Sequence, residues 1–444
     1  DVTLGHTTES GYHEYGALQT SGDGYIEITD FSTYYDPNIE WEQRSSNSRH
    51  SAVLLNNTSM YAENVSTELW ITDGVWTFLS FPYDVRVSDI TPMDSTTEWV
   101  IRRYDGAARA QGDMDATWVT MGANDILYAN QGYIWQSAYK VGYSGFIVPA
   151  LSTNNKQDIF AYNDQYVELK GYDSEFAHNR SWNLVGNPYP SYFDMRHMDF
   201  TAPVTTWNVN TQSYEAYMPG DDNYVFYPGE AFFVQRPDDS DYILFDITGR
   251  QSDRYIYYRN SAPARTLDAQ RTVINLTLSD GTFSDRTRVV LNESALSSYE
   301  LDKDASKFMS AGSLAPQLYS VADGVNYAIN ERPIADGTVE LGAQLVKAGS
   351  YTIALSSGSA AVVTLEDRAT GALVLLNAVE DYTFTAEAGT LTGRFVLYIN
   401  NTTGIGGVNQ NSDEGAIYDI SGRRVQNTNA AGVYIENGKK VVVK

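Results

Sequence analysis

Residues 76–83 read Trp-Thr-Phe-Leu-Ser-Phe-Pro-Tyr, and residues 182–189 read Trp-Asn-Leu-Val-Gly-Asn-Pro-Tyr. A second tryptophan follows each segment, Trp99 after the first and Trp207 after the second. Tryptophan beside leucine and valine in a strand is typical of a buried core. The proline then ends the strand, because it cannot donate a hydrogen bond to the ladder.

Each copy next reaches an aromatic strand that begins with glycine and ends in glutamine, at residues 132–136 and 229–235. Landmarks that recur in one order predict a duplicated β unit. We therefore expect residues 71–260 to form a duplicated, β-sandwich-like module. Its two units would pack their apolar faces together as a sandwich or a pseudo-symmetric barrel.

The rest of the chain also has the pattern of strands, so the predicted fold class is all-β. Tyrosine is abundant, at 33 residues, and aromatic residues favour strands. Short apolar segments between residues 265 and 400 are separated by turns such as 279–281, and they predict an antiparallel, jelly-roll-like β-sandwich. These segments are Thr272–Leu278, Arg288–Asn292, Gln317–Val321, Asn326–Ile329, Thr338–Leu341, Ser350–Leu355, Ala361–Leu365, Leu373–Leu376, Tyr382–Thr385 and Arg394–Ile399.

Three further stretches complete the expected organisation. Residues 1–70 carry strand-like pieces and are either edge material of the duplicated module or the end of an upstream domain. Residues 253–270 are expected to connect that module to the sandwich. Residues 401–414, rich in glycine, asparagine and serine, predict a flexible linker.

Composition excludes several kinds of partner and site. The 444 residues include 56 acidic and 30 basic side chains, a formal charge of −26. That field repels nucleic acid and anionic membrane surfaces, so neither is expected as a partner. The absence of cysteine excludes disulfides, thiolate zinc sites and cysteine nucleophiles. No run of eighteen apolar residues occurs, so no transmembrane segment is expected.

Residues 415–444 have the pattern of a small β unit of their own. Apolar triplets alternate with turn signals, and Asn437-Gly438 suits a two-residue hairpin because both residues tolerate positive φ. Basic side chains gather here in an otherwise acidic chain: Arg423, Arg424, Lys439, Lys440 and Lys444.

The order Gly-Arg-Arg-Val, Gly-Val-Tyr and Asn-Gly-Lys before a terminal lysine resembles the type A C-terminal sorting domain of proteins that the type IX secretion system of Bacteroidota exports. The resemblance implies a small Ig-like β sorting unit, with the export and attachment machinery as its partner. It implies a product placed on the cell surface or released, and no activity. Residues 182–190 together with 229–234 also resemble a Bacteroidota surface-protein module that precedes such tails. Residues 362–371 resemble the β-sandwich that is found next to these tails.

The sequence shows no recognisable catalytic centre. The histidines have no metal-site spacing, and for His6 and His13 we favour solvated side chains over zinc; the others are His50, His178 and His197. Residues 142–145 (Gly-Tyr-Ser-Gly) are one residue short of a nucleophile elbow, and residues 404–407 lack the lysine of a phosphate loop. We predict no catalytic, cofactor-binding or metal-binding residues and no enzyme.

Clustered carboxylates are the remaining candidates for chemistry. Asp221-Asp222 and Asp238–Asp241 are potential members of a glycosidase pair, which needs carboxyl groups about 5–10 Å apart. Residues 302–306 place oxygen donors at alternate positions, as a calcium loop does, but lack its glycine and distal glutamate. We expect solvated turns at these positions, with Ca²⁺ as the alternative and no other cofactor.

The expected function is that of a non-enzymatic cell-surface or secreted protein with an adhesive or structural role, whose partner is a surface glycan or a host or community protein. Two alternatives stay open. In one, exposed Trp76, Trp99, Trp182 and Trp207 form the glycan-binding module of a polysaccharide-utilising assembly. In the other, the chain supplies accessory modules to a larger secreted hydrolase, because the start at Asp1 suits a fragment as well as a mature form.

Overall fold

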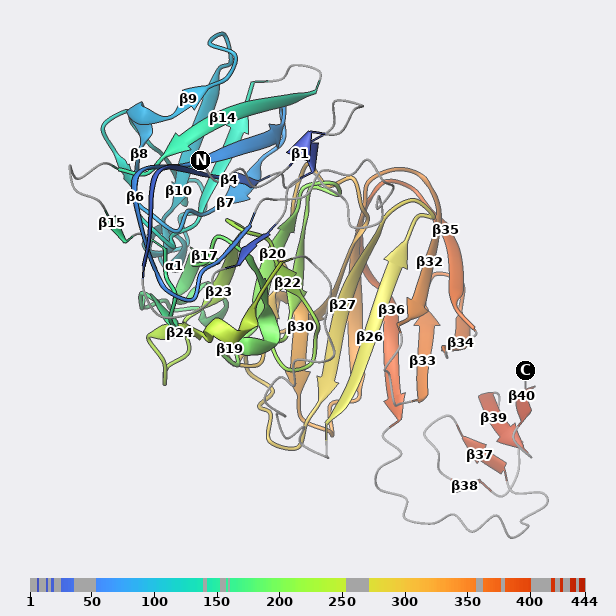
Figure 1. The fold of residues 1–444 in the computed structure, drawn as a ribbon. Coiled ribbons are helices and arrows are strands. Elements are labelled where there is room, and N and C mark those ends of the chain that lie inside the picture. The colour runs from blue at the N-terminus through green and yellow to red at the C-terminus, as the bar shows by residue number, and fades with distance from the viewer. Residues whose placement is uncertain are drawn as a thin grey trace. The chain divides into compact units, whose positions relative to one another are not determined.

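The computed structural model describes residues 53–138, 142–151, 160–252, 271–356, 362–376 and 380–400. Outside these ranges it describes only strands: β1 (His6–Thr7), β2 (His13–Glu14), β3 (Ala17–Gln19), β4 (Tyr25–Tyr35), β15 (Gln157–Asp158), β37 (Ile417–Asp419), β38 (Arg424–Val425), β39 (Gly432–Glu436) and β40 (Lys439–Val443). The fold is all-β, as predicted (Figure 1). Within the described residues, no helix has the length and apolar character that crossing a membrane requires. The contacts divide the chain into two compact units, Asp1–Asn401 and Thr402–Lys444.

Two segments of the first unit fold alike. Each contains a four-stranded antiparallel sheet whose strands pair in the same order relative to the sequence. In the first repeat the order is β7 (Thr77–Leu79), β13 (Tyr133–Ser137), β10 (Trp99–Tyr104) and β11 (Trp118–Thr120). In the second repeat it is β17 (Trp182–Gly186), β23 (Ala231–Gln235), β20 (Val204–Asn208) and β21 (Ser213–Tyr217).

The smaller sheets of the two repeats also correspond. The first repeat has β6 (Ser59–Thr72), β14 (Tyr143–Pro149) and β9 (Thr91–Pro92) in one sheet, and β8 (Val85–Arg86) with β12 (Ile126–Leu127) in another. The second has β16 (Gln165–Glu168), β24 (Tyr242–Phe245) and β19 (Met198–Asp199), and β18 (Tyr192–Asp194) with β22 (Val225–Phe226) and β25 (Arg250–Gln251). A 3₁₀ turn follows the corresponding strand in each: η1 (Val87–Asp89) and η3 (Met195–His197).

The boundary expected between residues 70 and 71 falls inside β6. This strand runs without a break from Ser59 to Thr72, because its buried side chains, Met60, Val65, Leu69 and Ile71, all belong to the core of the first repeat. Strand β4 pairs with β6 in parallel, so part of the first 70 residues is indeed edge material of this repeat.

The strand register corrects one of the sequence landmarks. The cross-strand pair Tyr104–Trp118 of the first repeat stands where Trp207–Tyr214 stands in the second. Trp207 therefore corresponds to Tyr104, and Trp99 is not its counterpart. The tyrosine and the tryptophan of this pair lie on opposite strands in the two repeats, and a search for identical residues at equivalent positions cannot detect that exchange.

The glycines that lead the aromatic strands do not correspond either. The register aligns Gly229 with Asn130, and Gly132 with Ala231. Asn130 and Gly229 share a positive φ, 63° and 71°, a conformation that both residue types adopt readily.

The repeats contact each other with approximate two-fold symmetry. The N–H of Ser80 donates to the carbonyl of Gly229 at 2.8 Å, and the N–H of Gly186 donates to that of Asn130 at 3.0 Å. The apolar faces of the two four-stranded sheets pack together, with the Phe78 ring stacked on Trp207 and edge-on to Phe233. This aromatic core between the repeats comprises Trp76, Phe78, Tyr104, Trp118, Ile134, Trp182, Leu184, Trp207, Tyr214, Ala231, Phe233 and Phe308.

Residues 272–400 of the first unit form one eleven-stranded sheet that nearly closes into a barrel (Figure 1). Its pairing order is β34 (Ala372–Leu376), β33 (Val362–Asp367), β36 (Gly389–Asn400), β31 (Thr338–Leu345), β29 (Gln317–Ala322), β30 (Val325–Arg332), β27 (Ser284–Leu291), β26 (Thr272–Ser279), β32 (Gly349–Leu355) and β35 (Tyr382–Ala386), with β28 (Ala305–Ser306) beside β30. Each of the predicted strands overlaps one of these, and β28 was not predicted.

The expected all-antiparallel arrangement has one exception in this sheet. Strands β27 and β30 are parallel. Parallel neighbours need a long crossover connection, and the chain supplies it through β28 and β29.

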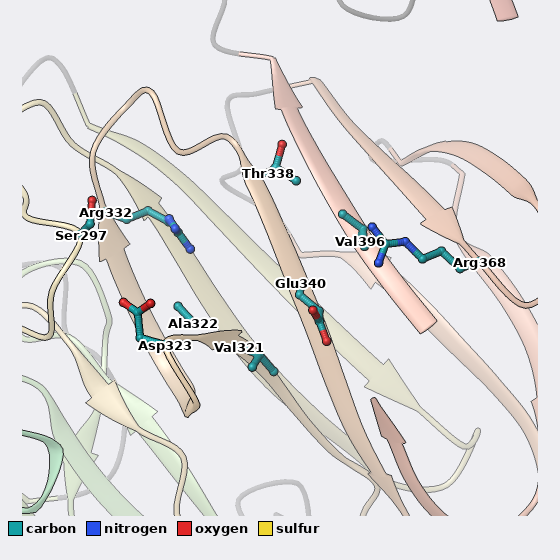
Figure 2. Close-up of a pocket in the computed structure, with 9 residues that line it drawn as sticks. All are labelled: Ser297, Val321, Ala322, Asp323, Arg332, Thr338, Glu340, Arg368 and Val396. Carbon is teal, nitrogen blue, oxygen red and sulfur yellow. The ribbon is translucent and has the colours of Figure 1, made fainter. Parts of the chain in front are cut away.

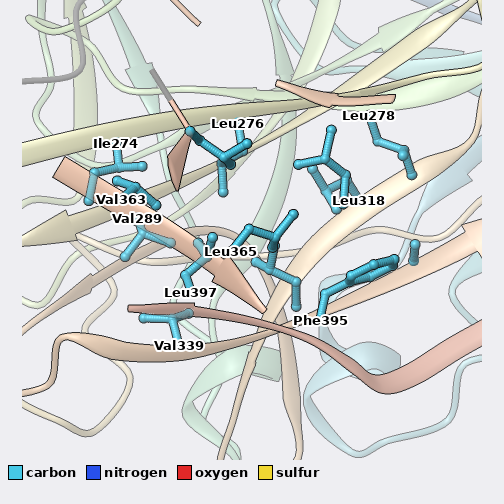
Figure 3. Packing of buried hydrophobic residues seen from close by; sticks show 14 of the residues in the cluster. Ile274, Leu276, Leu278, Val289, Leu318, Val339, Val363, Leu365, Phe395 and Leu397 are labelled. Atoms are coloured by element: carbon cyan, nitrogen blue, oxygen red, sulfur yellow. The ribbon is translucent and has the colours of Figure 1, made fainter. Parts of the chain in front are cut away.

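Alternation of apolar and polar residues explains how this sheet forms its core. Along β26 every second residue is buried, and Ile274, Leu276 and Leu278 point into the interior (Figure 3). Side chains near the two ends of the sheet meet, since the Tyr382 hydroxyl of the end strand β35 donates to Asp367 at 2.8 Å, and Asp367 lies in β33, next to the other end strand, β34.

The second unit contains an antiparallel sheet in the order β38-β37-β39-β40. Glu436 pairs with Lys439, so two residues separate the paired positions of the β39–β40 hairpin, the predicted loop length. The predicted linker, residues 401–414, and the predicted connector, residues 253–270, lie outside the described residues.

Candidate functional site

The acidic pair Asp221-Asp222 is held by arginines. Arg271 binds Asp221 at 3.0 Å, and Arg288 binds Asp222 at 2.6 Å. Arg286 and Glu331 complete a network of three carboxylates and three guanidinium groups. Because the charges balance and the groups are largely buried, this network joins the second repeat to the large sheet, and its carboxylates are already engaged by guanidinium groups.

The other acidic clusters are also engaged in structure. Asp238 forms an ion pair with Arg180 at the surface. Asp304 is buried, and its carboxyl group accepts hydrogen bonds from the backbone N–H groups of Glu300 and Glu331. Among the described residues no three acidic or histidine side chains are grouped as metal ligands would be.

The structure gives local partners to two of the histidines and to the Gly-Tyr-Ser-Gly segment. His197 Nδ1 contacts the Thr248 hydroxyl at 3.0 Å, and His178 is partly buried beside Tyr299. Ser144 donates to Asp73 at 2.5 Å within the first repeat. Strands β1 and β2, which carry His6 and His13, pair with each other. His50 and residues 404–407 lie outside the described residues.

The four tryptophans do not form an exposed platform. Trp182 is buried, and Trp76 and Trp207 pack in the aromatic core between the repeats. Trp99 packs on the core of the first repeat, against Trp135. This packing weakens the glycan-binding alternative, which depends on four exposed rings.

Two cavities lined by described residues are candidate sites. The first is a polar groove of about 330 Å³ on the large sheet, spanning β30, β29, β31, β36 and the end of β33 (Figure 2). Figure 2 shows Arg332 and Arg368 extending toward it from opposite sides, with Glu340 between them. Both arginines have nearby carboxylates, Asp336 at 3.5 Å and Glu366 at 3.4 Å. The groove is lined by Ser297, Val321, Ala322, Asp323, Arg332, Thr338, Glu340, Arg368 and Val396.

The second cavity, of about 380 Å³, opens at the end of the aromatic core between the repeats, and we call it the aromatic cavity. Its walls come from the first repeat, the second repeat and the segment after β28, a junction of the kind where ligand sites concentrate. It is lined by Tyr104, Arg109, Met114, Thr117, Trp118, Tyr214, Phe233, Lys307, Phe308 and Met309. The two methionines are exposed and form part of its rim.

A single helical turn positions Arg109 in this cavity. Helix α1 (Gly106–Ala110) begins after Asp105, whose carboxylate accepts from the N–H groups of Ala107 and Ala108 at 3.1 Å. Gly106 lets the turn lie directly on the carbonyl of Trp182, where a Cβ would overlap. The guanidinium then stacks on the rings of Trp182 and Phe308, at 5.0 and 4.3 Å.

The electrostatics around Arg109 are those of a buried cation. Burial raises the pKa of Tyr104 to about 12, and the charge of Arg109 opposes that rise. Burial also lowers the pKa of His178, and Arg109 lowers it further. Arg109 was not among the residues predicted from the sequence, where its signal is the capped Asp-Gly-Ala-Ala-Arg turn in a chain composed mainly of strands.

A buried acid at the contact between the repeats predicts a pH-dependent stability. Burial raises the pKa of Glu230 from 4.5 to about 8, although a hydrogen bond from Tyr224 opposes the rise. Between these values the folded protein holds a proton that the unfolded chain releases, so the free energy of unfolding falls as pH rises, by up to about 1.4 kcal/mol per pH unit. We expect Glu230→Gln to flatten this fall in urea titrations from pH 5 to pH 8.

Glutamine is a suitable replacement for two reasons. Like the protonated acid, it offers a carbonyl oxygen that accepts and a second group that donates, and Gln131 stands at the equivalent position of the first repeat. Asp304, whose pKa burial also raises to about 8, keeps its own contribution in the variant. An unchanged pH dependence in Glu230→Gln would contradict the assignment.

Comparison with known proteins provides one match. Residues 198–399 match a family described as a domain of unknown function, DUF8693. The match runs from β19 to β36 and includes every member of the Asp221-Asp222 network. No curated protein and no solved structure matches the chain.

Proposed function

We propose that this is a non-enzymatic protein that residues 402–444 direct across the outer membrane, and that the remainder acts at the cell surface or after release in an adhesive or structural role. The observation that carries the proposal is the separation of the chain into two compact units, with its own four-stranded sheet in the second. A delivery signal read by export machinery needs a unit that folds without the cargo.

The first unit suits a display or binding role. Its side chains build extended cores within the repeats, between them and inside the large sheet, and carboxylates that the sequence offered for catalysis are engaged in ion pairs and backbone hydrogen bonds. The proposed partners are the export and attachment machinery for the second unit and a surface glycan or protein for the first. The high negative charge argues against nucleic acid.

Export is tested with the full chain and a chain that ends at Asn401, each preceded by the same inner-membrane signal peptide, in a Bacteroidota host with a working type IX system. We expect the full chain on the surface, where added protease cleaves it, or in the medium, and the shortened chain in the periplasm. A third chain, with residues 432–443 in reversed order, controls for length and composition. Surface delivery of the shortened chain would contradict the proposal, and hydrolysis of a polysaccharide or peptide by the purified protein would contradict its non-enzymatic part.

A further inference from the structure

We propose that the aromatic cavity is a binding site for a small carboxylate ligand with an aromatic body, and that Arg109 binds the carboxylate. The proposal goes beyond export and surface display, since it names a ligand class for the first unit. It depends on the burial of one arginine and on the walls around it.

Arg109 is a buried cation for which the described part of the chain provides no counter-ion. Its residue is 9% exposed, and Nε is buried with no hydrogen-bond partner. Among the described residues no carboxylate lies within ion-pair distance of its guanidinium. The other cation of the cavity, Lys307, is already neutralised, because Asp285 lies 2.5 Å from its Nζ.

An unpaired buried charge destabilises the folded protein. A guanidinium group that has no carboxylate partner presents a planar set of N–H donors, whose geometry matches the two oxygens of a carboxylate. In this chain of net charge −26 the contrast is sharp, since acidic residues outnumber basic ones and yet no acidic side chain of the described ranges forms an ion pair with Arg109. We therefore infer that the counter-ion of Arg109 is the carboxylate of a bound ligand.

The walls determine the body of the ligand. Trp118, Phe233 and Phe308 present ring faces and edges, and Phe233 meets Phe308 edge-on at 5.0 Å. Aromatic rings pack well on such walls in offset or edge-on geometry. Met114 and Met309, 53% and 41% exposed, provide an adaptable apolar rim.

The test uses the full chain, with 3-phenylpropionate as the probe and its neutral amide as the reference, in titration calorimetry at low salt. We expect saturable binding of the acid and at least about tenfold weaker binding of the amide, since charge-assisted hydrogen bonds are about twice as strong as neutral ones. Arg109→Met should weaken binding of the acid to the level of the amide. Equal binding of acid and amide, or no saturable binding, would overturn the proposal.

A matched control separates ligand binding from core packing. Arg102 lies 5.0 Å over the ring of Trp76, as Arg109 does over the equivalent Trp182, but it does not line the cavity. Arg102→Met should therefore bind the acid as the wild type does. If it lost binding as Arg109→Met does, the arginine would act only through packing and the proposal would fail.

A second pair of variants covers the case in which Arg109→Met does not fold. Met309→Glu places a carboxylate at the exposed rim, where it repels an anion and competes for Arg109. We expect it to weaken binding of the acid about tenfold or more, whereas the neutral Met309→Gln retains it. Equal affinities for these two variants would contradict a role for charge.

Discussion

Gly186→Ala is expected to lower the free energy of unfolding by about 3 kcal/mol, the upper end of the usual cost of overpacking. Gly186 ends β17, and Ser80 follows β7 at the equivalent position of the other repeat. The two residues face each other where the repeats meet, and a Cβ on Gly186 would overlap the Cβ and Oγ of Ser80. Both strands are fixed there by hydrogen bonds to the opposite repeat, so neither backbone can move away. Urea unfolding followed by tryptophan fluorescence measures the loss.

The double variant Ser80→Gly/Gly186→Ala provides the control. It moves the single Cβ from one side of the contact to the other, and we expect stability within about 1 kcal/mol of the wild type. Ser80→Gly alone should cost about 1 kcal/mol or less, because its buried Oγ makes no hydrogen bond. If the double variant were as unstable as Gly186→Ala, the steric explanation would be refuted.

Asp222→Ala is expected to cost about 3–5 kcal/mol, because removing one partner of a buried pair leaves the other charge uncompensated. The side chain of Arg288 is 7% exposed, and Asp222 is its closest carboxylate, at 2.6 Å. The same carboxylate accepts from the N–H of Met218 at 2.7 Å and receives Arg286 at 3.3 Å. The loss is measured by urea unfolding at pH 7.

Asp238→Ala is the matched comparison, since it removes an aspartate from a pair with Arg180 in which Asp238 is 68% exposed. A surface pair of this kind contributes about 0–1 kcal/mol. The two variants remove the same side chain from the two acidic clusters that the sequence singled out. Similar losses for both would refute the distinction between a buried network and a surface pair.

Much of the fold could be predicted because it depends on local patterns. The alternation Thr-Val-Ile-Asn-Leu-Thr-Leu-Ser in β26 identifies a strand with one buried face, and the repeated Trp76 and Trp182 segments identify equivalent strands. The exchange of Tyr104–Trp118 for Trp207–Tyr214 could not be predicted, because core packing requires two aromatic rings at this pair of positions and does not require a particular residue at each. The parallel pair β27–β30 depends on a crossover that no local pattern reveals.

The sites were harder to predict than the strands, because charge in a sequence does not indicate its partners. Asp221 and Asp222 look like free carboxylates until the fold brings Arg271, Arg286 and Arg288 to them from the large sheet. Arg109 gives the opposite case, an ordinary basic residue whose importance lies in a counter-ion that the described residues do not provide. Export and surface placement depend on the resemblance of the tail and stay predictions.

Strand β36 is the last strand of the first unit along the chain, yet it lies between β33 and β31 in the large sheet and pairs with both. A ribosome makes the chain from its N-terminus, so the β33–β34 hairpin is complete before anything can join it to β31. Any nascent or prematurely terminated chain that lacks residues 389–400 thus carries two unpaired strand edges, which are templates for aggregation.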